Sequence, residues 1–530
     1  MISYKRATAT IVSFLCAFLA ESGVPSDPKY FDDQLVDHIS TDDNRRWTHR
    51  YYASDEYFQG AGSPIFVIMG GEGEILPSTG LYYPFIVNHL AKDFGAMVIQ
   101  PEHRFYGVSQ PVDVEFIPEN ANITRALMNS EQAMWDYIRL IRYTQASYGC
   151  SFDRGNYHYC PVITVGGSYP GFLSAMMRLK HPDVVDMAYS ASAPMKFYAQ
   201  QVDNDSYYDH ITKVAEKSSS GCKNAVKSVL DRISSLIQNI KTVDDLYEFS
   251  SDINICNGTL PSYIIDDESI YGNPDMNHVR KTLLEELVMV VGYTFANYNM
   301  ANYPPDNTTD LYHACQTFQN DELSDTERLS KFLVKVVNSM ENEPNHSCFN
   351  MTNQLPSGVH ATISSGDWSG VGTHRNGQMW DFQTCDLCVE HIGFGQNSMF
   401  PARDWTLDWL NHHCRKRFGF TPRPYELANK WHIDDLVNKT NASHILFTNG
   451  LNDGWSVGGI LESLSDTLPV INFENGAHHS DLSGVGPSDK DTDDIKKGFI
   501  TIKNILQEWL MEVKSIASHN NLRGETAIHV

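Results

Sequence analysis

Short apolar runs followed by glycine or proline constrain the fold more than any other feature of this sequence. Runs of this kind, rich in β-branched residues, are typical of buried parallel strands. Between the second and third runs, residues 129–146 carry apolar side chains at helical spacing. A strand, a helix and a further strand in this order predict a parallel sheet with helices on its faces, and hence the α/β class. The three runs are Ile65 to Met69, Ala96 to Ile99 and Val162 to Val165.

The sequence changes character at about residue 195 and changes back at about residue 400. In between, β-type runs fade, apolar residues recur at helical spacing, and cysteines are concentrated. We therefore predict a helical, disulfide-stapled insertion over residues 195–400, within an α/β domain formed by residues 23–194 and 401–530. The β-type runs resume at Ile445 to Thr448 and Val470 to Phe473.

The composition is typical of a folded, acidic protein. Of the 530 residues, 42% are hydrophobic and 20% are charged, and 40 basic against 65 acidic side chains give a net charge of −25. Nucleic acid and anionic membranes both attract basic surfaces. The acidic balance therefore argues against both as partners. No apolar run reaches the roughly 20 residues that a membrane-spanning helix needs.

The first 22 residues predict a secretory signal peptide. Lys5 and Arg6 precede an apolar stretch from Ala7 to Ala20, and small residues mark a cleavage site before Gly23. We therefore expect the protein in the secretory pathway, and the sequence leaves lysosomal and extracellular locations both open. Asn-x-Ser/Thr glycosylation motifs agree, because they matter only in that pathway. They begin at Asn122, Asn204, Asn257, Asn307, Asn345, Asn350, Asn438 and Asn441.

Nine of the ten cysteines follow the predicted signal peptide. In an oxidising compartment most of them should pair, and an odd number leaves one free or intermolecular. Cys385 and Cys388 have the spacing of a zinc or redox motif, and His412, His413 and Cys414 lie downstream. Structural disulfides are the preferred interpretation, because no second Cys-x-x-Cys motif exists. We therefore predict no metal and no other cofactor.

The segment Gly166-Gly167-Ser168-Tyr169-Pro170-Gly171 connects a predicted buried strand to a helix-like run. It resembles the nucleophile elbow of α/β-hydrolases, a sharp turn in which small neighbours expose a serine. The second glycine comes one position later than usual, because Pro170 occupies its place. Taken alone, the motif could equally be a glycine-rich turn with an incidental serine.

Further polar side chains follow predicted strands in the order that this fold requires. Asp453 follows the run that ends at Thr448, and His478 and His479 follow the run that ends at Phe473. In α/β-hydrolases the serine, the acid and the histidine occur in this chain order. Taken singly, Asp453 could be a turn residue and the histidines could be loop residues. Together with Ser168, they predict a catalytic triad.

Four ordered motifs closely resemble the lysosomal Pro-Xaa carboxypeptidase and dipeptidyl peptidase II family of serine peptidases, over about residues 30 to 515. The resemblance implies an α/β-hydrolase fold with an inserted helical cap domain. It also implies Ser168, Asp453 and His478 as the triad, because the first histidine of the pair is the catalytic one in that family. The motifs are Gly-Gly-Ser-Tyr-x-Gly at 166–171, Glu-His-Arg-Phe-Tyr-Gly-x-Ser-x-Pro at 102–111, Asn-Gly-x-x-Asp-x-Trp at 449–455 and Gly-Ala-His-His-x-Asp-Leu at 476–482.

The same motifs suggest how a substrate would be held. We expect the oxyanion to be bound by the backbone N–H of Tyr169 and by that of Gly71 or Glu72. Glu72 matches a family glutamate and would meet a charged group of the substrate. Trp455, two residues past the acid, would form an apolar wall suited to a proline ring, although it could equally be a core tryptophan.

The resemblance also bears on the structural residues. Glu102 and Arg104 are expected to form a buried ion pair. Proximity suggests a disulfide between Cys150 and Cys160, and the resemblance implies three others, which leaves Cys388 over. The implied pairs are Cys222 with Cys315, Cys256 with Cys348, and Cys385 with Cys414.

These features predict a serine exopeptidase that cleaves short peptides at prolyl bonds through an acyl-enzyme, with a Pro-Xaa carboxypeptidase as the first choice. A dipeptidyl peptidase II-like aminopeptidase stays open, because Asp-Leu-Cys-Val-Glu follows Cys385 where the family usually has Thr-Glu. A catalytically silent binding glycoprotein and an esterase or lipase on the same fold also stay open. Peptide substrates are the expected partners, and a homodimer is left open.

Overall fold

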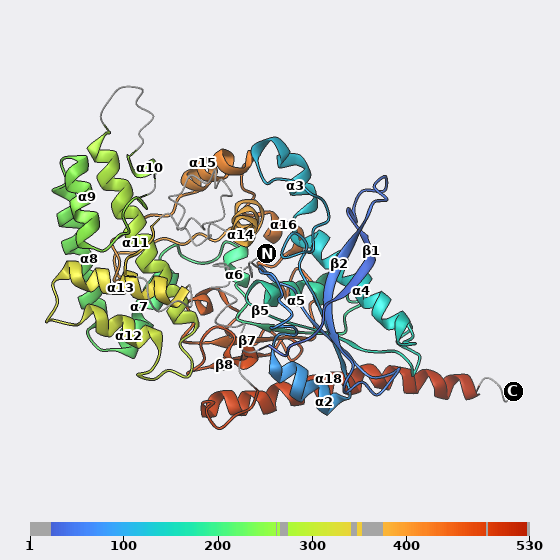
Figure 1. Ribbon diagram of the computed structural model, residues 1–530. Helices are drawn as coiled ribbons and strands as arrows, with labels where there is room; N and C mark the ends of the chain where they lie inside the picture. Colours follow the sequence, from blue (N-terminus) through green and yellow to red (C-terminus); the bar gives the residue numbers. More distant parts are fainter. Residues whose placement is uncertain are drawn as a thin grey trace, which may run out of the picture. The chain divides into compact units, whose positions relative to one another are not determined.

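The structure is a computed structural model that describes residues 23–260, 262–265, 274–340, 347–351, 375–483 and 486–526 (Figure 1). The predicted signal peptide and the glycosylation motif at Asn345 lie outside the described residues. The chain divides into two compact units. The sheet-bearing unit contains Leu19–Val202, Met379–His391 and the chain from Thr406 onward, and the helical unit contains Asp203–Gln378 and Ile392–Trp405.

An eight-stranded sheet forms the centre of the sheet-bearing unit, in the order β1-β2-β4-β3-β5-β6-β7-β8. Neighbouring strands from β4 to β8 are parallel, whereas β2 is antiparallel to both β1 and β4. The predicted parallel sheet is therefore confirmed, with an antiparallel pair added at one edge. The strands are β1 Lys29–Leu35, β2 Arg46–Ser54, β3 Ile65–Ile68, β4 Met97–Pro101, β5 Val162–Gly167, β6 Met187–Ala191, β7 Ile445–Gly450 and β8 Val470–Phe473.

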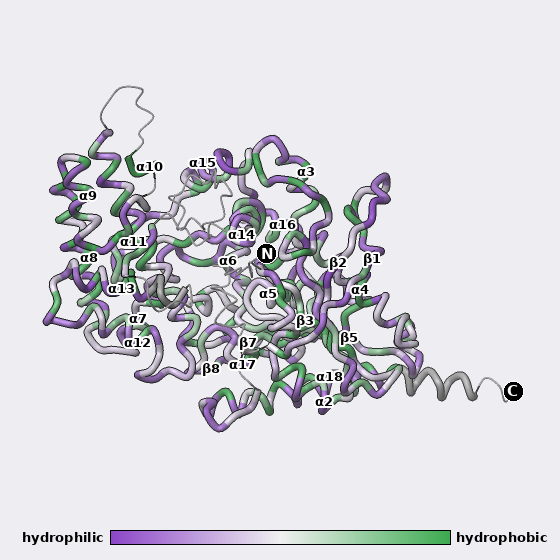
Figure 2. Tube along the Cα trace, in the orientation of Figure 1, coloured by the Kyte–Doolittle hydropathy of each residue, from purple (hydrophilic) through white to green (hydrophobic). Residues whose placement is uncertain are grey.

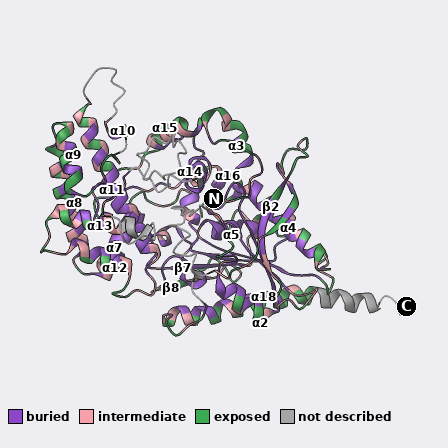
Figure 3. Ribbon diagram, viewed as in Figure 1, coloured by how far each residue is buried: buried purple, intermediate pink, exposed green. Residues whose placement is uncertain are grey.

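Helices lie on both faces of this sheet. The helices of the unit are α2 Ala91–Phe94, α3 Ala121–Leu127, α4 Ser130–Ser147, α5 Tyr169–Lys180, α6 Met195–Tyr198, the end of α14 Arg375–Asp386, α15 Leu407–Phe418, α16 Glu426–Trp431, α17 Ser480–Ser483 and α18 Asp493–Thr526. On one side α18 runs beside α2, where Lys503 Nζ lies 2.7 Å from Asp93 Oδ2, and α5 lies on the other side (Figure 1). Strand β7 is buried along its whole length (Figure 3), as are β3 and β5, because helices cover them from both sides.

The helical unit consists mainly of amphipathic helices, in which hydrophobic and hydrophilic stretches recur (Figure 2), whereas α11 buries residues on all its sides over 286–292. They are α7 Ser206–Ser218, α8 Cys222–Gln238, α9 Val243–Asp252, α10 Ser262–Ile265, α11 Met276–Met300, α12 Asp310–Phe318 and α13 Asp325–Met340. Helix α8, for example, buries Val226, Leu230 and Ile233 on one face. The unit differs in extent from the predicted 195–400 insertion, because Met379–His391 belongs to the sheet-bearing unit.

Four disulfides join the expected cysteine pairs. Cys150–Cys160 and Cys385–Cys414 lie in the sheet-bearing unit, and Cys222–Cys315 and Cys256–Cys348 lie in the helical unit. The two in the helical unit join residues 93 and 92 positions apart. In the chain-entropy model, closing loops of this length stabilises the folded state by roughly 4 to 5 kcal/mol each.

The asparagines of the described glycosylation motifs lie mostly at the surface, where a glycan could be attached. Asn350 is half-buried, and the exposed ones are Asn122, Asn204, Asn257, Asn307, Asn438 and Asn441. Among the helices of the described residues, none is long and apolar enough to cross a membrane.

Cys388 is the free cysteine of the described chain and is buried. Burial raises the pKa of its thiol well above the usual range. Because a buried, protonated thiol reacts poorly, we expect iodoacetamide to leave Cys388 unmodified in the native protein. After unfolding without reduction, the reagent should label Cys388 and no other mature cysteine. Peptide mapping under non-reducing conditions checks this, and Cys388 in an intramolecular bridge would refute it.

Candidate active site

Ser168 lies at a sharp turn between β5 and α5. Its backbone has φ 63° and ψ −133°, a conformation that non-glycine residues rarely adopt and that is concentrated at functional sites. The Ser168 N–H donates to the carbonyl oxygen of Ala191 at 2.9 Å, which ties the turn to the end of β6. Ser168 is partly exposed, whereas its neighbours Gly167 and Tyr169 are buried. The turn therefore presents the serine side chain at the carboxyl end of the sheet.

Two glycines permit the close packing of this turn. A Cβ on Gly166 would lie 2.3 Å from the carbonyl carbon of Pro170, and a Cβ on Gly171 would lie 2.7 Å from the carbonyl oxygen of Ala191. Gly171 thus provides the close approach to β6 despite its shifted position. Pro170 lies in the first turn of α5, where a missing N–H costs no hydrogen bond.

Asp453 and His478 meet at the ends of β7 and β8. His478 Nδ1 donates to Asp453 Oδ2 at 2.6 Å, and both side chains are buried. Asp453 Oδ1 also accepts the Trp455 N–H at 3.1 Å, which fixes the carboxylate. Within the described residues, His478 Nε2 has no hydrogen-bond partner. Because its Nδ1 carries the proton shared with Asp453, Nε2 is left with a lone pair that can accept a proton.

His479 has a different environment. Its N–H donates to Ser192 Oγ at 2.8 Å, and a Cβ on Gly167 would lie 2.6 Å from its ring. Burial, and the charge that His478 can carry, lower the pKa of His479 well below the usual value, so its ring is neutral. His479 thus packs against the residue before Ser168, while His478 is the histidine bound to the acid.

The residues expected at the oxyanion site lie together. The Tyr169 N–H belongs to the first residue of α5, where no carbonyl of the helix can accept it. Gly71, in the loop after β3, approaches the same turn, because a Cβ on it would lie 2.6 Å from Pro170 Cγ. The two backbone segments that could bind an oxyanion are therefore adjacent.

Trp455, one of the residues expected to bind the substrate, lies near His478. The Trp455 ring is half-buried, with its centroid 6.5 Å from that of His478 and 5.4 Å from that of Phe197. Burial raises the pKa of Glu72, and the charge that His478 can carry opposes this rise.

Glu390, at the end of the unusual segment after Cys385, has a shifted pKa that the sequence did not reveal. Burial, together with the negative charge of Glu72, raises its pKa to about 8. The Tyr198 hydroxyl donates to Glu390 Oε1 at 3.4 Å. The sequence could not predict this shift, because only the fold brings the Tyr198 hydroxyl to Glu390.

Glu102 and Arg104 are both buried in ion pairs, but with other partners, so the predicted pairing is wrong. Arg50 Nε donates to Glu102 Oε2 at 3.2 Å, because the pairing of β2 with β4 places the two residues side by side. Arg104 Nε instead donates to Asp136 Oδ2 on α4 at 2.6 Å. Both pairs lie within the sheet-bearing unit and stabilise its packing.

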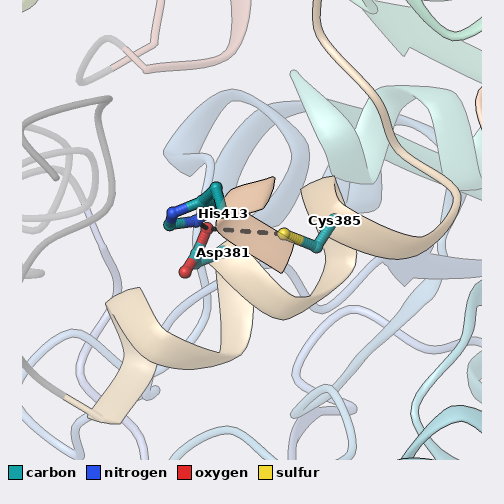
Figure 4. Close-up of side chains that lie close together, drawn as sticks. All are labelled: Asp381, Cys385 and His413. Carbon is teal, nitrogen blue, oxygen red and sulfur yellow. Dashed lines mark hydrogen bonds and ion pairs between the residues drawn. The ribbon is translucent and has the colours of Figure 1, made fainter. Parts of the chain in front are cut away.

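One cluster contains residue types that can bind a metal ion (Figure 4). It consists of Asp381, Cys385 and His413. His413 Nε2 lies 2.9 Å from Asp381 Oδ1, and the guanidinium of Arg417 pairs with the same carboxylate. The Cys385 sulfur is bonded to Cys414, and a metal would require a thiolate there. The cluster therefore links α14 to α15.

The sheet order and the strained serine at a strand-to-helix turn define an α/β-hydrolase. More narrowly, the chain belongs to the serine carboxypeptidase S28 family, whose model matches residues 34–499. The protein is therefore a serine-type peptidase, and the family resemblance predicted from the motifs is confirmed.

Curated relatives match over most of their length. Lysosomal Pro-X carboxypeptidase of Mus musculus is 25% identical over 500 residues, which cover 92% of this chain and 89% of the relative. The protein of the same name from Homo sapiens is 27% identical over 468 residues, or 86% of this chain and 82% of its own. Thymus-specific serine protease of Mus musculus is 24% identical over 516 residues, or 92% and 88%.

Proposed function

We propose that the protein removes the C-terminal residue that follows a proline, with Ser168, Asp453 and His478 as its triad. Ser168 Oγ attacks the scissile carbonyl carbon while His478 Nε2 takes the hydroxyl proton. His478 then gives this proton to the leaving amine, the C-terminal residue departs, and an acyl-enzyme remains. Water, activated by the same imidazole, hydrolyses the ester and releases the shortened peptide.

The observation that supports this mechanism best is the state of the His478 ring. Its Nδ1 is held by Asp453 at 2.6 Å, while Nε2 is buried and has no partner in the described chain. A buried imidazole nitrogen without a hydrogen-bond partner lowers the stability of the fold. A general base, however, needs such an unpaired nitrogen facing its substrate. The oxyanion would be bound by the N–H groups of Tyr169 and Gly71, and losing one such donor typically costs about 3 to 4 kcal/mol.

The preference for proline rests on Trp455 and on the relatives. Trp455 offers a half-buried aromatic surface beside His478, and a rigid proline ring covers such a surface at little entropic cost. Several relatives are named lysosomal Pro-X carboxypeptidase. We extend their location to this protein and propose the lysosomal lumen or the extracellular space as its place of action.

A peptide library with free termini, read by mass spectrometry, tests the substrate class. We expect loss of a single C-terminal residue, at least about tenfold faster after proline than after alanine or leucine, which corresponds to about 1.4 kcal/mol of transition-state discrimination. Release of N-terminal dipeptides would instead indicate a dipeptidyl peptidase. Equal cleavage after all three residues would refute the proline preference. The Ser168→Ala variant, which lacks the proposed nucleophile, is the negative control.

A further inference from the structure

The side chain of Tyr169, which directly follows the proposed nucleophile, ends in a buried group of hydrogen bonds. Its hydroxyl lies 3.2 Å from His103 Nε2 and 3.2 Å from Ser130 Oγ, and it accepts a hydrogen bond from Gln383 Nε2 at 2.9 Å. The Tyr106 hydroxyl donates to Gln383 Oε1 at 2.6 Å. All five side chains are buried. We call this group the Tyr169 network.

The Tyr169 network joins four segments of the sheet-bearing unit. His103 and Tyr106 follow β4, Ser130 begins α4, Tyr169 begins α5, and Gln383 belongs to α14. A buried polar network makes a structure rigid when each of its members is hydrogen-bonded. The start of α5 is therefore fixed to three other parts of the unit through one hydroxyl group.

The direction of each hydrogen bond follows from the state of His103. Burial lowers the pKa of His103 to about 4, so its ring is neutral at mildly acidic and neutral pH. His103 Nδ1 lies 2.8 Å from the carbonyl oxygen of Arg104, which can only accept, so Nδ1 carries the proton. Nε2 is then an acceptor, and the Tyr169 hydroxyl donates to it. The hydroxyl oxygen accepts from Gln383.

The nucleophile turn needs such an anchor because its backbone is strained. Ser168 has φ 63° and ψ −133°, and a conformation of this kind persists only where the surrounding structure fixes it. The main chain supplies one fixed point, because the Ser168 N–H donates to the carbonyl oxygen of Ala191. The Tyr169 hydroxyl supplies another. Between these points lies the Tyr169 N–H, which would bind the oxyanion.

We propose that His103 and Gln383 are positioning residues, which hold the Tyr169 hydroxyl and thereby direct the Tyr169 N–H towards the oxyanion. This inference rests on the proposed function. The aromatic ring is a rigid link between the hydroxyl and the main chain, so a displaced hydroxyl displaces the N–H as well. A misplacement of about 1 Å at a reacting centre can lower the rate about a hundredfold.

The Tyr169→Phe variant removes the hydroxyl and keeps the ring. On an N-blocked prolyl-phenylalanine peptide, we expect kcat per active site to fall about 10- to 100-fold, with KM changed less than about twofold, because the oxyanion forms only after binding. Titration with a fluorophosphonate counts the active sites. A network that only stabilised the fold would lower the free energy of unfolding and leave kcat per active site unchanged.

Tyr159→Phe is the matched control. Its hydroxyl is also buried and donates to Asp186 Oδ2 at 2.8 Å, but Tyr159 precedes the start of β5, whereas Ser168 follows the end of this strand. The variant should therefore keep the wild-type kcat.

An aldehyde inhibitor probes the oxyanion site itself. Ser168 Oγ forms a bond to the carbonyl carbon of an N-blocked proline aldehyde, the hydroxyl proton passes to His478, and the carbonyl oxygen becomes an oxyanion. In Tyr169→Phe, the inhibition constant should rise by the factor by which kcat falls. The corresponding alcohol cannot form this adduct, so its inhibition constant should change less than about twofold.

Two His103 variants test the network independently, should Tyr169→Phe fail to fold. His103→Gln keeps an acceptor for the Tyr169 hydroxyl, whereas His103→Leu does not. We expect His103→Leu to lower kcat per active site at least about tenfold without a change in KM, and His103→Gln to stay within about threefold of the wild type.

Four results would overturn the inference. They are an unchanged kcat per active site in Tyr169→Phe, an equal loss in Tyr159→Phe, a loss that lies wholly in KM, and equal losses in His103→Gln and His103→Leu. If the wild type neither cleaves the peptide nor binds the aldehyde, the proposed function fails and the inference with it. If the wild type does both and the variants keep its kcat, only the inference fails.

Discussion

Replacing His478 with alanine is expected to lower kcat by about four to six orders of magnitude while the protein stays folded. Without the imidazole, the Ser168 hydroxyl has no base to take its proton. Asp453→Asn should lower kcat by about 10⁴, because an amide at this position favours the tautomer with the proton on Nε2. Steady-state kinetics on a prolyl peptide measure both losses, and circular dichroism confirms folding.

His479→Ala is the matched control for this prediction. Its ring packs against Gly167 and carries no hydrogen bond to Asp453, so we expect a loss in kcat of no more than about tenfold to a hundredfold, from disturbed packing. A His479 variant that is more damaging than the His478 variant would show that the general base has been assigned to the wrong ring.

Replacing Arg104 with methionine should lower the free energy of unfolding by about 3 to 5 kcal/mol. The Arg104 and Asp136 side chains are fully buried and joined by two hydrogen bonds, of 2.6 Å and 2.8 Å. The Arg104 guanidinium also donates to the carbonyl oxygen of Leu127 at 2.9 Å. The substitution removes both guanidinium donors from the buried carboxylate, which keeps only His38, and removes the guanidinium donor from this carbonyl. Chemical denaturation measures the loss.

The loss in the free energy of unfolding caused by Arg104→Met should depend on pH. Burial alone would raise the pKa of Asp136, but the charge and hydrogen bonds of Arg104, with a hydrogen bond from His38, hold it at about 2. A lowered pKa stabilises the folded state fully above the unfolded value of about 3.9 and progressively less as the pH falls towards 2. In Arg104→Met, burial without the guanidinium should raise the pKa of Asp136 above its unfolded value, so the difference in stability between wild type and variant should shrink progressively as the pH falls from neutral towards 2.

The exposed pair between Arg139 and Asp33 offers a control. Its ion pair is 2.8 Å long, but the Asp33 side chain is 67% exposed. Arg139→Met should cost less than about 1 kcal/mol, because water screens such pairs. Equal losses for Arg139→Met and Arg104→Met would mean that burial does not set the energetic importance of the Arg104–Asp136 pair.

The central strands could be predicted because they are apolar on both faces. β3, β4 and β5 coincide with runs rich in valine and isoleucine, and β7 coincides with the apolar run Ile445 to Thr448. The edge strand β8 coincides with the run Val470 to Phe473. β6 was missed, because Met-Ala-Tyr-Ser-Ala contains no β-branched residue, and it forms a strand by pairing with β5 and β7. The edge strand β1 and its neighbour β2 were missed because they carry many charged and polar residues.

The positions of the candidate catalytic residues followed from chain order. The side chains that pair with the buried charged residues around them did not. Ser168, Asp453 and His478 could be proposed as a triad because they follow three strands of the sheet, β5, β7 and β8, in the chain order that this fold requires. The partner of Arg104 could not, because Asp136 meets it only when α4 packs against the sheet. Glu390 likewise lies far from Tyr198 in sequence, and only the folded chain forms the hydrogen bond between them.

Labelling with a fluorophosphonate probe, followed by peptide mapping, tests most directly whether Ser168 is the activated nucleophile. We expect one probe per protein, attached to the peptide that contains Ser168 and absent from the Ser168→Ala variant. Because general base catalysis contributes about 10²- to 10⁴-fold, labelling of His478→Ala should be slower by at least about a hundredfold. Labelling of a different residue, or of none in the folded wild-type protein, would contradict the assignment of Ser168, Asp453 and His478 as a catalytic triad.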